Sequence, residues 1–152
     1  IKKEFSRIMS LKDGLKKMSK SEISDLSRIN LTDDKDTIVK KIKKAKTDAL
    51  PIPSTIEELE KRPEVKNLIG IYSSLAGLTL ENSLNEFSGK NFSLFKENLS
   101  QLLIEKIIPI SLEIKKLLND HNYLDSILID GYKKADKIAS KKVEKIHEII
   151  GF

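Results

Sequence analysis

Apolar residues recur at helical spacing through most of the chain, and the first clear case covers residues 35–47. Lysines fill the positions between the apolar ones, and Asp34 or Asp36 stands where a capping side chain is expected. The apolar positions with the 3, 4, 7 spacing of one helical face are Ile38, Val39, Ile42 and Ala45. The pattern therefore predicts a helix over 35–47 with a lysine-rich outer surface.

Two more helices are predicted after the stiff connection Pro51–Pro53. Residues 54–57, Ser-Thr-Ile-Glu, fit a capping box, with a hydroxyl at the cap and a carboxylate three residues on. They open a short helix that ends before Pro63. Pro63 suits the first turn of a helix over 64–76, and Gly77 suits its C-cap. The buried stripe of this helix is predicted to be Val65, Leu68, Ile69, Tyr72 and Leu75.

The remaining pattern predicts three helices. Thr79 caps a short one, and longer ones run over about 92–118 and 123–149. The inward positions of the first long helix are predicted to be Phe95, Leu99, Leu102, Leu103, Ile107, Ile110, Ile114 and Leu117. Those of the last helix are predicted to be Leu124, Ile127, Leu128, Tyr132, Ala135, Ile138, Ala139, Val143 and Ile146.

The first 28 residues have no helical period and are expected to be irregular. Residues 8–11 are either the end of a short strand or a turn. No run in the chain alternates cleanly between apolar and polar residues, as a half-buried strand does. The predicted fold is therefore mainly α, a helical bundle preceded by a loop-rich N-terminal segment.

The amino-acid composition limits the kinds of site and partner that the chain can have. The 152 residues include no cysteine and only two histidines, His121 and His147, so disulfides are excluded and a metal held by protein ligands is not expected. The net charge of +5 favours an anionic partner such as nucleic acid or a nucleotide. There is no apolar run of the ~20 residues that would span a bilayer, and no secretory signal is visible. We expect no membrane association.

The stretch Lys17-Met18-Ser19-Lys20-Ser21 is the most informative in the chain. Two ammonium groups, two hydroxyls and the nearby Gly14 are the composition of a loop that grips a polyphosphate. A solvated loop is the alternative, because charge runs often serve solubility. A second basic surface is predicted on the last helix, either as a solvated face or as a contact for nucleic-acid phosphates. Its residues are Lys133, Lys134, Lys137, Lys141, Lys142 and Lys145.

The literal string Lys-Met-Ser-Lys-Ser resembles the second signature of class I aminoacyl-tRNA synthetases. Further blocks narrow the resemblance to the bacterial-type tryptophanyl-tRNA synthetase family. They are residues 7–11 (Arg-Ile-Met-Ser-Leu), Lys16, residues 41–48 (Lys-Ile-Lys-Lys-Ala-Lys-Thr-Asp) and the ending 149–152 (Ile-Ile-Gly-Phe). Glu22 departs from the aspartate usual in the family. The alternatives are a tyrosyl-tRNA synthetase fragment and a non-catalytic helical tRNA-binding module.

The resemblance implies an ATP-dependent tryptophan–tRNA ligase. Residues Ile8, Lys17, Met18, Ser19, Lys20 and Ser21 would bind ATP, and Mg²⁺ would accompany its phosphates. Lys17 and Lys20 would act as the catalytic residues by stabilising the leaving pyrophosphate. The implied partners are tRNA(Trp), tryptophan and ATP, with a homodimer for the full enzyme and a cytoplasmic location. The helical region from about Pro51 would contact the anticodon.

Part of the expected family pattern is missing from this chain. No His-Ile-Gly-His-like signature is present, and the chain begins with Ile1 rather than methionine. The resemblance therefore implies a C-terminal part of the enzyme, inactive by itself. In this interpretation residues 1–34 are the tail of a Rossmann-type catalytic domain that carries the signature loop, and residues 35–152 are an anticodon-binding-type helical domain.

Overall fold

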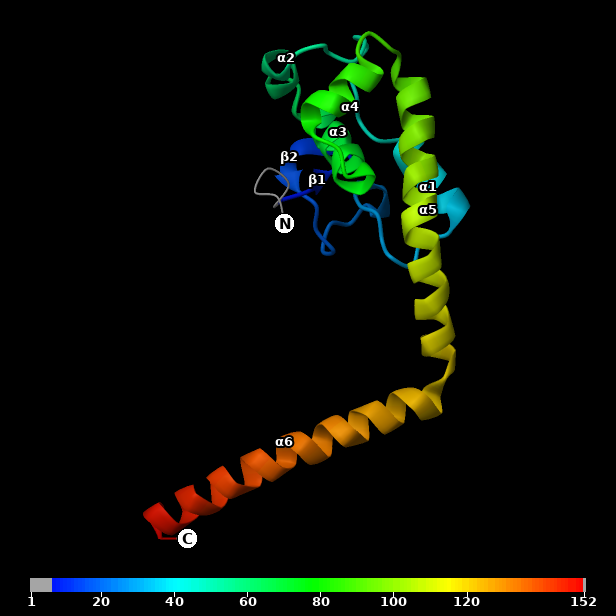
Figure 1. Ribbon diagram of the computed structural model, residues 1–152. Coiled ribbons are helices and arrows are strands. Elements are labelled where there is room, and N and C mark those ends of the chain that lie inside the picture. The colour runs from blue at the N-terminus through cyan, green and yellow to red at the C-terminus, as the bar shows by residue number, and fades with distance from the viewer. Residues whose placement is uncertain (1–6, 152) are drawn as a thin grey trace. The chain divides into compact units, whose positions relative to one another are not determined.

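The structure is a computed structural model that describes residues 7–151. This part of the chain divides into two compact units, one that ends at Leu112 and one that begins at Glu113. The helices are α1 (Lys35–Lys43), α2 (Ile56–Glu60), α3 (Pro63–Ala76), α4 (Leu80–Phe87), α5 (Phe92–Asn119) and α6 (His121–Ile150) (Figure 1). The prediction of a mainly α fold is confirmed. A domain boundary between residues 34 and 35 remains a prediction.

The helices begin where short polar side chains cap them. Asp34 accepts a hydrogen bond from the Thr37 amide at 2.8 Å, and Thr79 accepts one from the Asn82 amide at 3.2 Å. The predicted capping box was displaced by one residue, because Thr55 is the N-cap of α2 and accepts from the Glu58 amide at 3.2 Å. Gly77 ends α3 with φ of 71°, the left-handed conformation that glycine adopts without strain.

Helix α1 is shorter than predicted because the chain after it binds elsewhere. The Lys46 amide donates to the Leu11 carbonyl at 2.7 Å, which draws residues 44–47 away from the helix. The Lys96 ammonium of α5 donates to the carbonyls of Lys43 at 3.3 Å and Ala45 at 2.7 Å. These tertiary bonds satisfy the carbonyl groups that a longer helix would have used.

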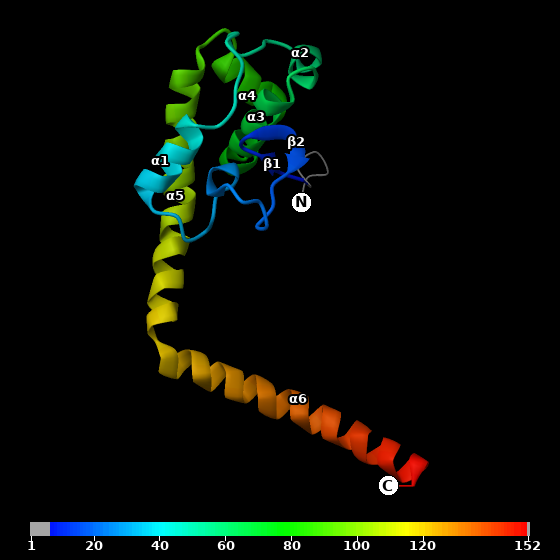
Figure 2. The same ribbon diagram turned by 180° about the vertical axis from the view of Figure 1, so that it is seen from behind.

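The N-terminal segment was predicted to be irregular, but it contains a β-hairpin. Strands β1 (Met9–Ser10) and β2 (Asp13–Lys17) pair antiparallel, with Met9 opposite Lys17 and an irregularity in the register. The side chain of Asn67 in α3 fastens the hairpin, since it accepts from the Met9 amide at 2.9 Å and donates to the Met9 carbonyl at 2.8 Å. The hairpin therefore lies against α3 (Figure 2).

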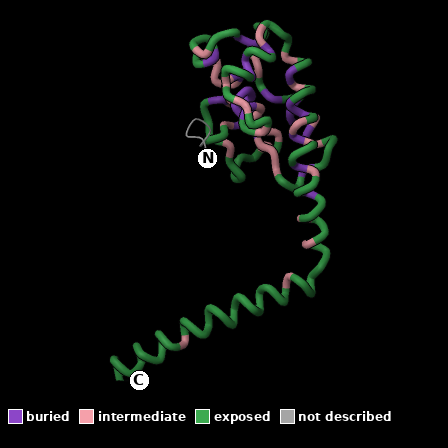
Figure 3. The backbone as a smooth tube through the Cα atoms, in the orientation of Figure 1, coloured by how far each residue is buried: buried purple, intermediate pink, exposed green. Residues whose placement is uncertain are grey.

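The core lies in the first unit, and it includes Leu11 of the hairpin turn, Ile38 and Ile42 of α1, and residues of α3, α4 and α5 (Figure 3). Three aromatic rings pack together in it, and Phe87 meets each of the other two edge to face. The Tyr72 and Phe87 centroids lie 4.9 Å apart, and those of Phe87 and Phe95 lie 5.0 Å apart. The prediction that Tyr72 packs in the core is therefore confirmed.

Helix α6 of the second unit does not bury the stripe that its pattern predicted. None of its residues is buried, and Tyr132 is 68% exposed, so its predicted core packing was wrong. Ile110 of α5 is likewise exposed. An apolar helix face becomes buried only when another element covers it, and within residues 113–151 no such element is present. No helix in the described part of the chain is long and apolar enough to cross a membrane.

Candidate nucleotide-binding site

The signature stretch begins inside the hairpin and not in a loop. Lys17 is the last residue of β2, and the Met18 amide donates to the Ile8 carbonyl at 3.0 Å, which extends the pairing by one step. Met18 is partly buried and packs against the core. Only residues 19–21 leave the hairpin, and Lys17, Ser19, Lys20 and Ser21 are exposed. The structure therefore fixes one end of the stretch and leaves its polar side chains open to solvent.

The two hydroxyls of the stretch lie next to each other. The Ser19 and Ser21 Oγ atoms are 2.9 Å apart, and the Ser21 amide donates to Ser19 Oγ at 3.3 Å. Neither the Lys17 nor the Lys20 ammonium has an ion-pair or hydrogen-bond partner within residues 7–151. Two free cations beside two hydroxyls and open backbone amides can hold an anion with several oxygens.

A cleft of about 440 Å³ separates this stretch from the segment that follows it. Met18, Ser19 and Lys20 line one side, and residues 28–32 line the other. Ile8, although bonded to Met18 through its backbone, is 46% exposed and lines a different hollow of about 340 Å³ between the hairpin and α3. The structure thus brings Met18, Ser19 and Lys20 to one cleft but does not bring the Ile8 side chain there.

The far wall of the cleft is built on a charged cluster that the sequence pattern did not reveal. Lys41 of α1 is 1% exposed, and its Nζ lies 2.7 Å from both Asp25 Oδ2 and Asp33 Oδ2. Arg28 contacts Asp25 Oδ1 at 2.9 Å, and Asn30 donates to the same atom at 3.0 Å. The hydrogen bond from Lys41 is the largest cause that lowers the pKa of Asp25 below its ordinary value.

The prediction that the lysines between the apolar positions of this helix lie on its outer surface was wrong for Lys41, although the spacing of residues in α1 carried a signal. Lys41 lies three residues after Ile38 and four before Ala45, and therefore on the same helical face as those buried side chains. A lysine on an apolar face needs a buried carboxylate partner. Asp33 supplies it from the turn before the helix, where it is nearly buried and also accepts from the Asn30 amide at 2.9 Å.

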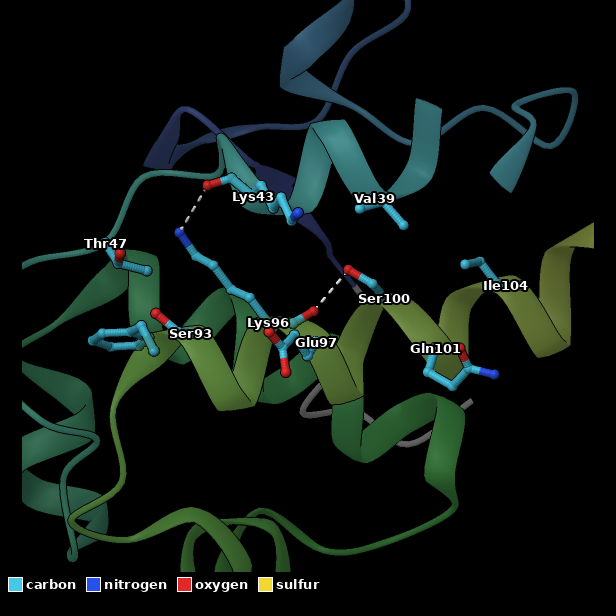
Figure 4. Close-up of a pocket in the computed structure, with 10 residues that line it drawn as sticks. Val39, Lys43, Thr47, Ser93, Lys96, Glu97, Ser100, Gln101 and Ile104 are labelled. Carbon is cyan, nitrogen blue, oxygen red and sulfur yellow. Dashed lines mark hydrogen bonds between the residues drawn. The ribbon is translucent and has the colours of Figure 1, made fainter. Parts of the chain in front are cut away.

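A larger groove of about 650 Å³ lies between α1 and α5, and Figure 4 shows the side chains that line it. Lys96 crosses it toward the end of α1, where it binds the carbonyls described above. Burial lowers the pKa of the Lys96 ammonium. Because its donors are used by the backbone, Lys96 serves as a C-terminal cap for α1 rather than as a free cation in the groove.

The described part of the chain holds no preformed set of ligands for magnesium. Within residues 7–151 no group of three or more histidine, aspartate or glutamate side chains could hold a metal ion. The carboxylates of Asp25 and Asp33, behind the far wall of the cleft, already accept from Lys41. A Mg²⁺ ion would therefore be held by the phosphates of a nucleotide and by water, as is usual for this ion.

The fold and the signature stretch together define a class of protein. Residues 3–110 match the family described as tRNA synthetases class I (W and Y), and the chain belongs to this family. Its relatives include the tryptophan–tRNA ligases of Mesorhizobium japonicum, at 51% identity over 96% of this chain and 41% of the relative, and of Rickettsia felis, at 50% identity over 97% and 44%. The predicted resemblance to the tryptophanyl branch is confirmed.

Solved structures agree with these relatives. The tryptophanyl-tRNA synthetase of Campylobacter jejuni, determined with ADP and tryptophan, matches with a TM-score of 0.74 and 26% identity, over 97% of this chain and 44% of that one. The enzyme of Mycoplasma pneumoniae matches with a TM-score of 0.69 and 27% identity, over 99% and 45%. This chain therefore spans about two fifths of the length of the relatives it matches.

Proposed function

We propose that this chain is the C-terminal part of a tryptophan–tRNA ligase and that its signature stretch binds ATP. The observation that carries the proposal is the placement of the stretch. Lys17 and Lys20 are exposed and free of partners at the end of a hairpin that Asn67 fastens to α3. The names of the relatives, at about half identity over nearly the whole chain, support tryptophan as the amino acid.

In this proposal the carboxylate of tryptophan attacks the α-phosphorus of ATP and pyrophosphate leaves. Negative charge grows on the leaving group, and Lys17 and Lys20 stabilise it more strongly in the transition state than in the bound substrate. Ser19 and Ser21 donate to phosphate oxygens. Met18 offers an apolar contact to the base or ribose, and Ile8 contacts the adenosine after a movement of the hairpin end. Mg²⁺ would be held by the phosphates and by water, and it would supply positive charge to their oxygens.

The rest of the chain would serve the transfer step. We assign residues 1–34 to the tail of the catalytic domain and residues 35–152 to the helical domain, whose region from Pro51 onward contacts tRNA(Trp). The full enzyme would act as a homodimer in the cytoplasm. The other three fifths of the relatives' length would supply the tryptophan pocket and the opposite wall of the nucleotide site, so this chain alone is expected to be inactive.

The proposal is tested by joining this chain to the N-terminal part of the M. japonicum relative and measuring tryptophan-dependent exchange of pyrophosphate into ATP. We expect Lys17→Ala and Lys20→Ala each to lower kcat by on the order of 10²-fold, as for the loss of one donor to a developing oxyanion. Lys16→Ala is the matched control, because adjacent strand residues point to opposite faces.

Two results would contradict the proposal. One is an unchanged rate in both variants, which would favour the alternative interpretation that the stretch is only a solvated loop. The other is clear tryptophan-dependent exchange by the 152-residue chain alone, which would show that the chain holds a complete site.

A further inference from the structure

Stability alone does not explain why a charged cluster surrounds the buried side chain of Lys41. A buried ion pair gives back little more than the cost of removing its charges from water, so apolar side chains would serve a core position as well. Lys41 nevertheless stands on the buried face of α1, with Ile38 and Ile42 as neighbours. Its two carboxylate partners both come from the segment 22–34 that joins the signature stretch to α1.

A continuous series of contacts leads from Lys41 back to the signature stretch. Lys41 Nζ lies 2.7 Å from Asp25 Oδ2, and Asp25 Oδ1 lies 2.9 Å from Arg28 Nη2. Arg28 Nη1 then donates to the Glu22 carbonyl at 2.8 Å. Glu22 directly follows Ser21, so three polar contacts connect a buried lysine of α1 to the end of the phosphate-binding stretch.

The other groups around Lys41 hold the same segment. Asn30 donates to Asp25 Oδ1 at 3.0 Å and to Asp33 Oδ1 at 3.3 Å, and it accepts from Arg28 Nε at 3.3 Å. Arg28 and Asn30 also line the cleft opposite Lys20. The cluster therefore determines both the far wall of the cleft and the path of the backbone as it leaves Ser21.

We propose that Lys41 is a positioning residue for the ATP site: through Asp25 and Arg28 it fixes the backbone after Ser21 and thereby holds Lys20 at the cleft that Arg28 and Asn30 also line. This inference rests on the proposed function for its consequence in catalysis. Lys41 itself contacts no substrate in this proposal. A misplacement of about 1 Å at a reacting group is enough to cost on the order of 10²-fold in rate, so such an anchor matters to the reaction.

The first experiment measures amide hydrogen exchange in the 152-residue chain, and it needs no activity. The variants are Lys41→Met, which removes the buried cation, and Asp25→Ala, which breaks the middle contact at a side chain that is 53% exposed. We expect the amides of Ser27 and Arg28, which donate to the carbonyls of Ser24 at 3.0 Å and Asp25 at 3.4 Å, to exchange about tenfold faster or more in both variants. Those of α3 keep their protection, because the loss is a local opening. Lys40→Met, an exposed lysine beside Lys41, is the control.

The second experiment uses the enzyme joined to the M. japonicum N-terminal part. Lys41→Met and Asp25→Ala are expected to raise KM for ATP about tenfold and to leave KM for tryptophan unchanged, because only the phosphate-binding stretch is displaced. If Lys41 served only stability, loss of folded enzyme would lower kcat/KM for ATP and kcat/KM for tryptophan by the same factor. Asp25→Ala keeps the test decisive if Lys41→Met does not fold.

The outcomes separate the two proposals. Unchanged exchange at the amides of Ser27 and Arg28 in Asp25→Ala, or equal changes in KM for ATP and tryptophan, overturns the role of Lys41. An inactive joined enzyme overturns the proposed function, and the exchange measurement then still decides whether Lys41 holds the segment after Ser21.

Discussion

Arg62 shows how one side chain can join three segments of the first unit. Its Nε donates to Asp48 Oδ2 at 2.7 Å, and its Nη1 donates to the Pro51 carbonyl at 2.7 Å. The guanidinium carbon lies 5.8 Å from the centroid of the Phe92 ring. The connection 48–51, the start of α3 and the start of α5 are therefore held by one planar, permanently charged group.

Acid should weaken this junction, because the hydrogen bonds from Arg62 hold the pKa of Asp48 below its ordinary value of 3.8. A carboxyl whose folded pKa is lowered stabilises the fold fully above the unfolded value and loses that contribution as the pH falls through the folded value. We expect Asp48→Asn to cost on the order of 1 kcal/mol at pH 7, a figure reduced for the partial exposure of Asp48, and to cost less at pH 3.

The measurement is urea unfolding at the two pH values. Glu97→Gln, at an exposed position of α5, is the control for the loss of one negative charge. If Asp48→Asn destabilises the protein equally at pH 7 and pH 3, the carboxylate charge has no part in the junction.

Among single residues, the sequence correctly predicted helix caps, because a cap depends only on residues close to it in the chain. The caps at Asp34, Thr79 and Gly77 are local features, and the structure confirms them. Arg62 and Lys96 were not found, because their partners lie 14 residues and 51 residues away along the chain. Side chains that bind distant backbone groups leave no periodic signal.

At the scale of elements the hairpin is the main correction, and Gly14 explains why it was missed. In the sequence Asp13-Gly14 has the composition of a loop, but Gly14 lies buried in β2. A Cβ atom there would be 2.5 Å from both the Glu64 nitrogen and the Pro63 carbonyl carbon. The glycine therefore permits the strand to approach α3 and does not serve to bend the chain.

We expect Gly14→Ala to destabilise the first unit by about 1–3 kcal/mol, the usual cost of forcing extra volume into a packed site. The backbone of α3 has to give way, and the hairpin that carries Lys17 shifts with it. Gly131→Ala is the matched control, since nothing lies within 4 Å of its Cβ position and alanine is favoured in helix α6. Chemical unfolding of both variants checks the prediction. A Gly14→Ala protein as stable as the unaltered chain would show that the hairpin does not press against α3.

The long helices were predicted almost to the residue, because their apolar period persists over many turns. The period also predicted burial, and there it succeeded for α3 and for the first half of α5 but not for α6. Periodicity reports which face is apolar. Whether another element covers that face depends on parts of the protein far away in sequence. This chain spans only about two fifths of the length of the relatives it matches.

The net charge of +5 favours an anionic partner, and the lysines of α6 are the candidate surface for binding tRNA. Lys142 lies nine residues after Lys133, or two and a half turns, and therefore points away from α6 on the side opposite Lys133. Lys133 and Lys137 are one turn apart, exposed, and without an ion-pair partner in the described part of the chain. This pair therefore presents two ammonium groups on one side of the helix.

If this face binds tRNA, the double variant Lys133→Gln/Lys137→Gln in the joined enzyme should weaken charging of tRNA(Trp) while pyrophosphate exchange keeps its rate. Each lost phosphate contact lowers the slope of log affinity against log salt by roughly 0.7–0.9, so the slope should fall by about 1.5. Lys142→Gln, with the same chemical change on the opposite side of the same helix, should leave both steps and the slope unaltered. An equal loss in charging and exchange would mean that the lysines act through stability, and an unchanged salt slope would return them to a solvated face that serves only solubility.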